Sequence, residues 1–528
     1  MITSKSNKTL WFNKKKLTTW IPLLNNSIIE DSKSKMHLIG SNFHMERLDR
    51  IEITKKNEVH MRIDCEPGIA QEISDYFTFT VPGHTFMPSF RQKIWDGKIR
   101  LYNVFTKLLY IGLLEYLCKF AISRNYPIKF LSEFEPDKVE ASKFISTLGL
   151  NYQVRDYQLS AINHSLSRRR CLLLSPTASG KSLIIYIIVR YLNIKTLIIV
   201  PTTSLVSQMY KDFQDYGFNV EEHCHIVFAG RDKSSEKQVI ISTWQSIYKL
   251  GEEYFKQYEL VIGDEAHGFK SKSLTAIMTK CINARYRIGA TGTLDGTQTH
   301  KLVLEGLFGK VHQVTTTKKL IDKKYLSPFS IKAIILKYPD VICDNLKKAK
   351  YQEELNYLIS CEERNKFIRN LALDLSTNTL LLFRLVKKHG SILYEMIKEK
   401  TDAQNRQTYF VHGGTDTETR EKIRAIVENE QDAIIVASYG VYSTGINIRN
   451  LHNIIFASPS KSRIRNLQSI GRALRKSENK EKATLYDIAD DLSWKTHQNY
   501  TLDHFNQRMK IYNEERFDCK IYNVNIKI

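Results

Sequence analysis

The stretch SPTASGKS at positions 175–182 carries residues that can hold a phosphate chain. In loops that end in Gly-Lys-Ser, backbone N–H groups point at the phosphates, the lysine offsets their charge and the hydroxyl contacts the bound Mg²⁺. Lys181 and Ser182 would take the last two roles here. Ser175 stands where the usual pattern has its first glycine, so a chance Gly-Lys-Ser in an ordinary strand–turn–helix is the alternative.

A second stretch, LVIGDEAHGF at 260–269, offers two adjacent carboxylates. Asp264 can hold Mg²⁺ directly or through water, and Glu265 can orient and deprotonate an attacking water. Acidic residues at strand ends are common, so the pair alone indicates little. Because it ends an apolar strand in the same α/β unit as Lys181, the two stretches together predict a nucleoside triphosphatase.

The hydrophobic pattern indicates the elements that position these residues. The apolar run 171–174 predicts a buried strand before the loop, and 183–192 predicts a helix after it. Between about residues 154 and 314, apolar strands alternate with helical stretches, and a second such series follows. This alternation is typical of parallel sheets with crossover helices. We therefore expect an α/β fold with two successive parallel-sheet units.

The composition favours a polyanionic partner. Among 528 residues, Lys and Arg outnumber Asp and Glu 78 to 56, so the net charge is +22 and the pI is near 9.4. Nucleic acid fits best, although an AT-rich genome would also raise the lysine content. The eight cysteines form no C-x-x-C pair, which favours reduced thiols. No apolar stretch is long enough for a membrane span, so we expect no membrane partner and a cytoplasmic location, in an infected host cell if a phage encodes the chain.

These patterns divide the chain into five predicted segments. They are a loose extension (1–48), a small α+β DNA-binding domain (49–135), an ATP-binding lobe (136–325), a second lobe (326–491) and a helical C-terminal tail (492–528).

The motifs resemble, in order, those of the superfamily-two helicases and translocases. In that family a proline and a small residue commonly replace the first glycine of the phosphate loop, which accounts for Ser175. The resemblance implies two tandem RecA-like parallel-sheet lobes, with ATP and Mg²⁺ bound between them. Besides the phosphate loop, the motifs that carry it are RDYQ (155–158), DEAH (264–267), ATGT (290–293) and QSIGRALR (468–475).

This resemblance assigns roles to single residues. Glu265 would be the catalytic base, and Gln468, Arg472 and Arg475 would reach the γ-phosphate from the second lobe, where the arginines stabilise transition-state charge. The helix face that carries the two arginines could instead be a solvated surface. Ser182 and Asp264 would hold Mg²⁺. The residues expected to bind ATP are Arg155, Gln158, Thr177, Gly180, Lys181, Ser182, Asp264 and Gly445.

Two further stretches resemble motifs that contact nucleic-acid phosphates without reading sequence. They are PTTSLVSQ (201–208) and STWQS (242–246). Hydroxyl, amide and N–H groups make such contacts. The predicted contacts are Thr202, Thr243 and Gln245. Asn447, where many relatives have Asp, is left without a role.

The stretches MRIDCE (61–66), WDGKIRL (95–101) and VASYGVYSTGINIRNLH (436–452) narrow the resemblance. With the motifs above, they look like the UvsW recombination helicases of T-even-like phages, over about residues 50–528. That family implies an ATP-dependent helicase on branched DNA and RNA–DNA hybrids, active in R-loop unwinding, fork regression and Holliday-junction migration during phage recombination, repair and replication. We also expect a monomer, with phage recombination proteins as further partners.

Other classes of function stay open at this point. A double-strand DNA translocase without unwinding and an RNA helicase share the same motifs. A DNA-binding module with a vestigial ATPase is a third alternative, which the intact Lys181 and Glu265 disfavour.

The segment RQKIWDGKIRLY at 91–102 is predicted to be a DNA-binding hairpin. Asp96-Gly97 is a favoured two-residue turn, and it would place Lys93 opposite Arg100. A phosphate would relieve the repulsion between these two cations. The alternative is a solvated basic face with Trp95 packed on its own domain. The predicted DNA contacts are Arg91, Lys93, Trp95, Lys98 and Arg100, with Tyr102 on the same face.

Overall fold

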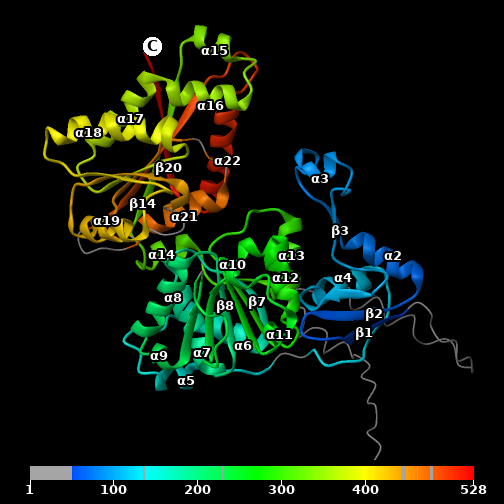
Figure 1. Ribbon diagram of the computed structural model, residues 1–528. Helices are drawn as coiled ribbons and strands as arrows, with labels where there is room; N and C mark the ends of the chain where they lie inside the picture. Colours follow the sequence, from blue (N-terminus) through cyan, green and yellow to red (C-terminus); the bar gives the residue numbers. More distant parts are fainter. Residues whose placement is uncertain are drawn as a thin grey trace, which may run out of the picture.

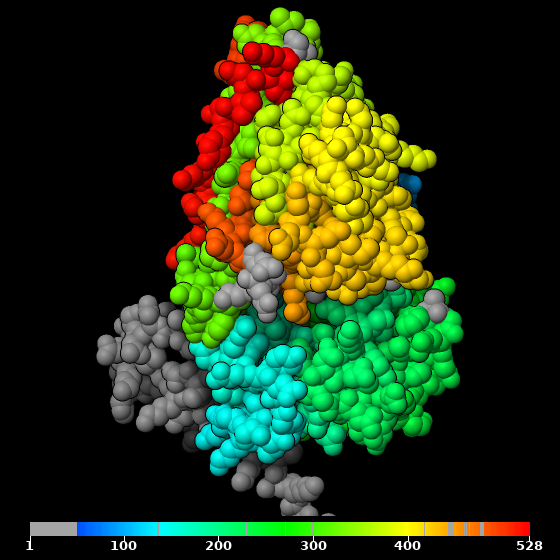
Figure 2. All heavy atoms as spheres, turned by 90° about the vertical axis from the view of Figure 1, so that its left-hand side faces the viewer, coloured from blue at the N-terminus to red at the C-terminus, as the bar shows by residue number. Residues whose placement is uncertain are grey.

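The computed structural model describes residues 50–134, 137–228, 230–441, 448–458, 460, 462–475 and 480–527. They form a small N-terminal domain and two α/β lobes (Figure 1). Lobe 2, coloured from light green through yellow to red, lies directly on lobe 1, coloured cyan to green (Figure 2). The predicted class of two tandem RecA-like lobes with a small α+β domain is confirmed. The predicted extension 1–48 lies outside the described residues.

Lobe 1 is built on a parallel sheet with the strand order β13-β7-β12-β11-β8-β10-β9 in the part of the chain that the structure describes. Strands buried on both faces must be apolar throughout, and β8 and β10 are buried at every residue. The strands are β7 (Arg170–Leu174), β8 (Thr196–Val200), β9 (Cys224–Val227), β10 (Val239–Thr243), β11 (Leu260–Asp264), β12 (Tyr286–Thr291) and β13 (Val311–Gln313).

Helices cover both faces of this sheet and close two apolar cores. The order of strands places the carboxyl ends of β7, β8, β10 and β11 at one edge of lobe 1, which is where ligands bind in such sheets. The helices are α5 (Ser142–Thr147), α6 (Asp156–Arg168), α7 (Lys181–Leu192), α8 (Thr203–Asp215), α9 (Val220–His223), α10 (Trp244–Ile247), α11 (Glu252–Lys256), α12 (Lys272–Lys280) and α13 (Gln298–Phe308).

Lobe 2 repeats this plan, with the order β16-β17-β15-β18-β19-β14-β20 among the described residues. Its strands are β14 (Phe329–Lys337), β15 (Thr379–Phe383), β16 (Thr408–Val411), β17 (Ile434–Ser438), β18 (Asn453–Phe456), β19 (Ala483–Asp491) and β20 (Asp518–Asn525). Its helices are α14 (Thr317–Asp322), α15 (Asp340–Leu346), α16 (Tyr351–Ser360), α17 (Glu362–Asp374), α18 (Ser391–Asp402), α19 (Thr417–Asn429), α21 (Arg463–Ala473) and α22 (Tyr500–Glu514).

The C-terminal segment departs from the predicted helical tail. Helix α22 is present, but the chain then forms β20, which pairs in parallel with β14 along eight residues. Buried ion pairs also fix the segment, because Arg508 of α22 donates to both carboxylate oxygens of Asp487 at 2.9 Å. The segment after residue 492 is therefore part of lobe 2 and completes its sheet.

The N-terminal domain is a small sheet, of order β5-β2-β1-β6, packed on two helices. A second pairing, β3 with β4, carries a projection that contains the short helix α3 (Figure 1). The elements are β1 (Ile51–Lys55), β2 (His60–Asp64), α2 (Pro67–Tyr76), β3 (Thr78–Thr80), α3 (Pro88–Arg91), β4 (Lys98–Arg100), β5 (Leu108–Tyr110), α4 (Leu114–Ser123) and β6 (Ile128–Phe130).

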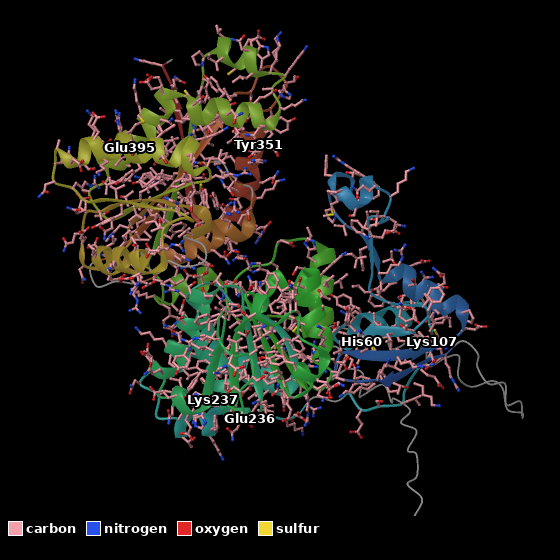
Figure 3. All side chains as sticks on the ribbon, in the orientation of Figure 1. His60, Lys107, Glu236, Lys237, Tyr351 and Glu395 are labelled. Atoms are coloured by element: carbon pink, nitrogen blue, oxygen red, sulfur yellow. The ribbon has the colours of Figure 1, made fainter. Side chains whose placement is uncertain are left out.

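This domain and lobe 1 share one continuous apolar core. A side chain at Gly112 would place its Cβ 1.9 Å from the carbonyl oxygen of Glu305, so α13 approaches the domain as closely as glycine permits. Arg170 of lobe 1 forms an ion pair with Glu58, 2.5 Å between N and O. Figure 3 shows His60 on the side of the domain next to lobe 1, where burial lowers its pKa to about 4. The two parts therefore behave as one rigid body.

The predicted hairpin at 91–102 is wrong. Gly97 has φ +79° and the chain does turn there, but β4 pairs with β3, with Thr78 opposite Arg100. Pro88 begins α3, which its fixed φ favours, so 88–91 are helical, and 92–95 form turns and bends in place of the expected strand. Tyr102 is buried and does not lie on a DNA-facing surface.

Candidate active site

The loop between β7 and α7 has the geometry of a phosphate cradle. Gly180 has φ +83°, and a Cβ there would lie 2.3 Å from Nε2 of Gln158, so the position requires glycine. Ser175 is buried, and its hydroxyl lies 2.6 Å from that of Ser179. The serine that replaces the usual first glycine thus forms a hydrogen bond within the loop. Lys181 follows the loop as the first residue of α7.

Gln158 and Arg155, both predicted to bind ATP, belong to a network of hydrogen bonds that reaches this loop. Gln158 is buried, donates to the carbonyl of Ser179 at 2.9 Å and accepts from the Arg155 N–H at 2.9 Å. Tyr157 donates to the same carbonyl at 3.0 Å, and Arg155 donates to the Tyr157 hydroxyl at 2.8 Å. The start of α6 and the phosphate loop are therefore held together by a network of hydrogen bonds.

The two carboxylates at the end of β11 lie against Lys181. Its Nζ is 3.2 Å from Oε1 of Glu265, and Nδ1 of His267 lies 3.3 Å from Oε2. Burial by itself would raise the pKa of Glu265, but the charge of Lys181 and the contact with His267 outweigh it and hold that pKa well below its usual range. Glu265 is thus an ionised carboxylate, as a base that accepts a proton from water must be.

Asp264 differs from its neighbour. Burial raises its pKa, Lys181 opposes this shift, and the charge of Glu265 adds to it. Its Oδ1 is buried and makes no hydrogen bond to the described residues. A buried acceptor without a partner is costly in free energy, and a metal ion would satisfy it.

Residues of lobe 2 reach this site from across the cleft. Gln468 on α21 donates to Oε2 of Glu265 at 3.2 Å. The positive charge of Arg472 acts to lower the pKa of Lys181, so the Arg472 guanidinium lies near the phosphate loop. Arg475 similarly lies within electrostatic range of Asp212 on α8. A Cβ at Gly471 would lie 2.6 Å from Cβ of Thr177, so α21 packs on the loop itself.

Comparisons with known proteins agree with this geometry. Three family models match: the type III restriction enzyme res subunit over 151–296, the N-terminal domain of DNA helicase UvsW over 50–131 and the helicase conserved C-terminal domain over 363–477. The ATP-dependent DNA helicase uvsW of Enterobacteria phage T4 is 34% identical over 497 residues, which are 88% of this chain and 98% of that protein. The chain belongs to the UvsW helicase family.

Membership of the UvsW family makes the protein an ATP-dependent helicase, as the motifs predicted. The crystal structure of T4 UvsW aligns with 90% of this chain and 99% of its own, at 32% identity and a TM-score of 0.46. A fragment of a putative HsdR subunit of a type I restriction enzyme from Vibrio vulnificus aligns with 85% of this chain and 84% of its own, at 15% identity and a TM-score of 0.55, which supports the fold alone.

The residues of this UvsW-family site fit ATP with Mg²⁺. Asp264 offers the unpaired buried oxygen, and Ser182 is the second residue of α7, directly after Lys181. The Ser182 hydroxyl is 3.0 Å from that of Tyr216, and a hydroxyl that donates one bond still has lone pairs for a metal. Within the described residues, no cluster of three or more metal-ligating side chains exists. Mg²⁺ takes one or two carboxylates and fills its other positions with phosphate and water, so the Asp264 carboxylate is a suitable protein ligand for it.

The predicted phosphate-contacting residues gather at the carboxyl ends of two neighbouring strands. Thr202 caps α8 after β8, and Thr243 ends β10, which pairs with β8. Gln245 is exposed and donates to the carbonyl of Pro201 at 3.3 Å, which joins the two motifs. Gly445 and Asn447 lie outside the described residues. The basic residues predicted on 91–102 lie on the N-terminal domain, away from this site.

Tyr325 was not predicted, although it contacts the site. The guanidinium carbon of Arg155 lies 4.0 Å from the centre of its ring, and Lys323 forms an ion pair with Asp156 at 2.7 Å. Both Tyr325 and Lys323 belong to the segment between α14 and β14, at the start of lobe 2. Its sequence, KKYLSP, has no periodicity, so only the fold could show that it touches the start of α6.

Among the residues that the structure describes, none of the helices has the length and apolar content of a membrane span.

Proposed function

We propose that the protein is an ATP-dependent helicase that acts on branched DNA and on RNA–DNA hybrids. The activities would be R-loop unwinding, fork regression and Holliday-junction migration in phage recombination, repair and replication. The T4 relative is an ATP-dependent DNA helicase, which supports DNA as the substrate, because the two proteins align over nearly their whole lengths. The net charge of +22 supports a polyanionic partner.

The observation that carries the mechanism is the contact between the lobes at Glu265. This carboxylate meets Lys181 of lobe 1 and Gln468 of lobe 2 at 3.2 Å each. A nucleotide bound there would touch both lobes, so its binding and hydrolysis can change how α21 of lobe 2 sits on lobe 1. Such closure and opening is a way to move along a nucleic-acid strand.

Each residue has a task in this mechanism. Lys181 and the loop N–H groups around Thr177 and Gly180 bind the phosphates, and Gln158 with Arg155 binds the base. Glu265 takes the proton of the attacking water. Mg²⁺ would be held by Ser182 and Asp264, where it offsets phosphate charge. Arg472 and Arg475 stabilise charge as it develops on the γ-phosphate, and Gln468 keeps the carboxylate of Glu265 oriented. Gly445 is proposed to line the same site from lobe 2.

The projection on β3 and β4 is proposed as a second DNA contact. We call residues 83–97 the α3 knob. Its exposed basic residues include Arg91 and Lys93, and exposed apolar side chains lie beside them, with Phe86 and Ile94 each 76% exposed. The exposed ring of Phe86 is suited to stack on open bases at a junction, and Ile94 adds apolar surface beside it.

Three of the contacts predicted on 91–102 are already engaged. Arg91 donates to the carbonyl of Thr85 at 3.1 Å, the Trp95 indole N–H donates to the carbonyl of Lys98 at 2.8 Å, and Arg100 is paired with Asp96. Lys93 of the knob and Lys98 of the adjoining β4 are therefore the better pair to test. Their double alanine variant should lose affinity for forks and keep its affinity for plain single strands, measured by fluorescence anisotropy. An equal loss on both substrates would contradict a role at junctions.

The proposed function is tested by strand displacement. Forked DNA, R-loops and RNA duplexes of the same sequence are incubated with the protein and ATP, and Lys181→Ala is the inactive control. We expect turnover on the forks and R-loops and none on the RNA duplex. Displacement of RNA duplexes with no DNA activity would show an RNA helicase. ATP turnover stimulated by DNA without displacement would show a double-strand translocase.

A further inference from the structure

A cavity of about 480 Å³ opens on lobe 1 beside α10. Trp244 and Tyr248 form aromatic walls, Lys233 and Lys249 supply positive charge, and Gln245 supplies an amide. No carboxylate is found among the residues that line this part of the described structure. An aromatic and cationic lining is suited to a ligand that combines a flat ring with negative charge.

The aromatic walls are held in place from behind. Trp244 and Tyr248 are half-buried against the apolar core, and their ring centres are 5.9 Å apart at an angle of 61°. Lys280 of α12 donates to the carbonyls of Tyr248 and Leu250, at 3.3 and 2.6 Å, and so fixes the end of this turn. The walls need little further ordering to receive a ligand, which favours binding.

The cavity adjoins the residues proposed to contact nucleic-acid phosphates. Gln245 lies in its lining and also bonds the carbonyl of Pro201, next to Thr202. Ser246 lies in the lining too, and its hydroxyl is 2.9 Å from that of Thr243. Figure 1 shows α10 at the edge of lobe 1 that faces lobe 2, where such a strand would run.

We propose that this cavity takes one unpaired base of the nucleic-acid strand that crosses lobe 1. The base stacks on Trp244, and the flanking phosphates lie near Lys233 and Lys249. This inference rests on the proposed function, because it assumes that a strand runs past Thr202 and Thr243. Stacking accepts every base, so the site would hold the strand without selecting a sequence. A captured base would keep the strand from slipping back while lobe 2 moves.

The test separates bases from phosphates. Binding is measured by fluorescence anisotropy on two single strands of equal length, one normal and one with every base removed. Trp244→Ala should bind the normal strand about tenfold more weakly than the wild type, and should bind the abasic strand equally well. Trp244→Phe keeps a ring and should stay within about twofold of the wild type on both strands.

Charge is tested with a matched pair of variants. Lys249→Gln should weaken binding to both strands by the same factor, since both carry the phosphates. Lys143→Gln removes the same charge from α5, at the end of lobe 1 away from lobe 2, and should change neither affinity. Equal effects of Lys249→Gln and Lys143→Gln would overturn the phosphate contact and with it the proposed placement of the strand.

The binding results distinguish a wrong cavity proposal from a wrong proposed function. If Trp244→Ala binds the normal strand as tightly as the wild type does, or loses affinity by the same factor for both strands, the cavity takes no base. A lower melting temperature with an equal loss would assign Trp244 to packing alone, which also overturns the inference. If the wild type itself binds neither strand, the proposed function fails and the cavity proposal with it.

Discussion

Replacing Glu265 with glutamine should slow ATP turnover and at the same time tighten ATP binding. The substitution keeps the shape of the side chain and removes its charge. Without the carboxylate, the attacking water loses its base, and loss of general-base catalysis lowers kcat by about 100- to 10,000-fold. The second effect follows from the ion pair between Glu265 and Lys181.

Lys181 must leave Glu265 to meet the phosphates of ATP. At 3.2 Å, two unit charges attract by about 5 kcal/mol for an effective dielectric constant of about 20. Desolvation of the two groups cancels most of this attraction. A net attraction of about 1.4 kcal/mol between Lys181 and Glu265 corresponds to a factor of about ten in the affinity for ATP. Glu265→Gln should therefore bind ATP about tenfold more tightly.

Two measurements check this pair of effects. A fluorescent ATP analogue gives Kd, and a coupled assay with DNA present gives kcat. Glu259→Gln, at the exposed other end of β11, is the matched control and should change neither value. A kcat within tenfold of the wild type would refute Glu265 as the base. Weaker ATP binding would refute the argument that the ion pair opposes the nucleotide.

Four further outcomes are expected. Lys181→Ala should abolish ATP turnover, because the phosphates lose their compensating charge, while DNA binding by anisotropy persists. The logarithm of DNA affinity should fall steeply and linearly with the logarithm of salt concentration, with little dependence on duplex sequence; a flat line would contradict backbone-dominated binding. Tyr325→Ala should raise the KM for ATP several-fold and Tyr325→Phe should not, because a ring at this position orients Arg155 over the base site; equal KM values would contradict this. The melting temperature should fall as the pH is lowered from 6.5 to 5, because burial lowers the pKa of His389 to about 3, whereas in the unfolded chain this histidine takes up a proton near pH 6.5. Protonation therefore favours the unfolded state, by about 2 kcal/mol at pH 5. His389→Gln should make the melting temperature less dependent on pH.

The nucleotide site could be predicted from the sequence because its residues follow strands. In a parallel sheet, the carboxyl ends of all strands lie at one edge, so Lys181 after β7 and Asp264 at the end of β11 lie on the same edge, with only β12 between their strands. The contact with Gln468 could be predicted only from the resemblance to a family, because the local sequence of α21 does not indicate which surface this helix contacts.

Elements without a local signal were missed or misassigned. Strand β20 is an exposed edge strand with polar residues, DCKIYNVN. Its sequence therefore has no alternation of apolar and polar residues that would have predicted the pairing with β14. Asp96-Gly97 does form a turn, but the strand that pairs with β4 comes from residues 78–80. The chain reaches that partner because Phe77 and Leu101 are buried in the domain core, which is a tertiary effect.

The N-terminal domain and lobe 1 act together because their shared core cannot open without exposing apolar surface. The lobes share no such buried core: only the partly buried Tyr157 and Ala178 of lobe 1 pack on the core of lobe 2 in the described part of the chain, and other contacts named above are polar. They include the hydrogen bond of Gln468 to Glu265 and the ion pair of Lys323 with Asp156, both polar and partly solvated. Polar contacts of this sort exchange readily with water, so a change at the nucleotide can shift lobe 2 at little cost in free energy. The α3 knob would then stay fixed to lobe 1 and hold one part of the DNA while lobe 2 moves another.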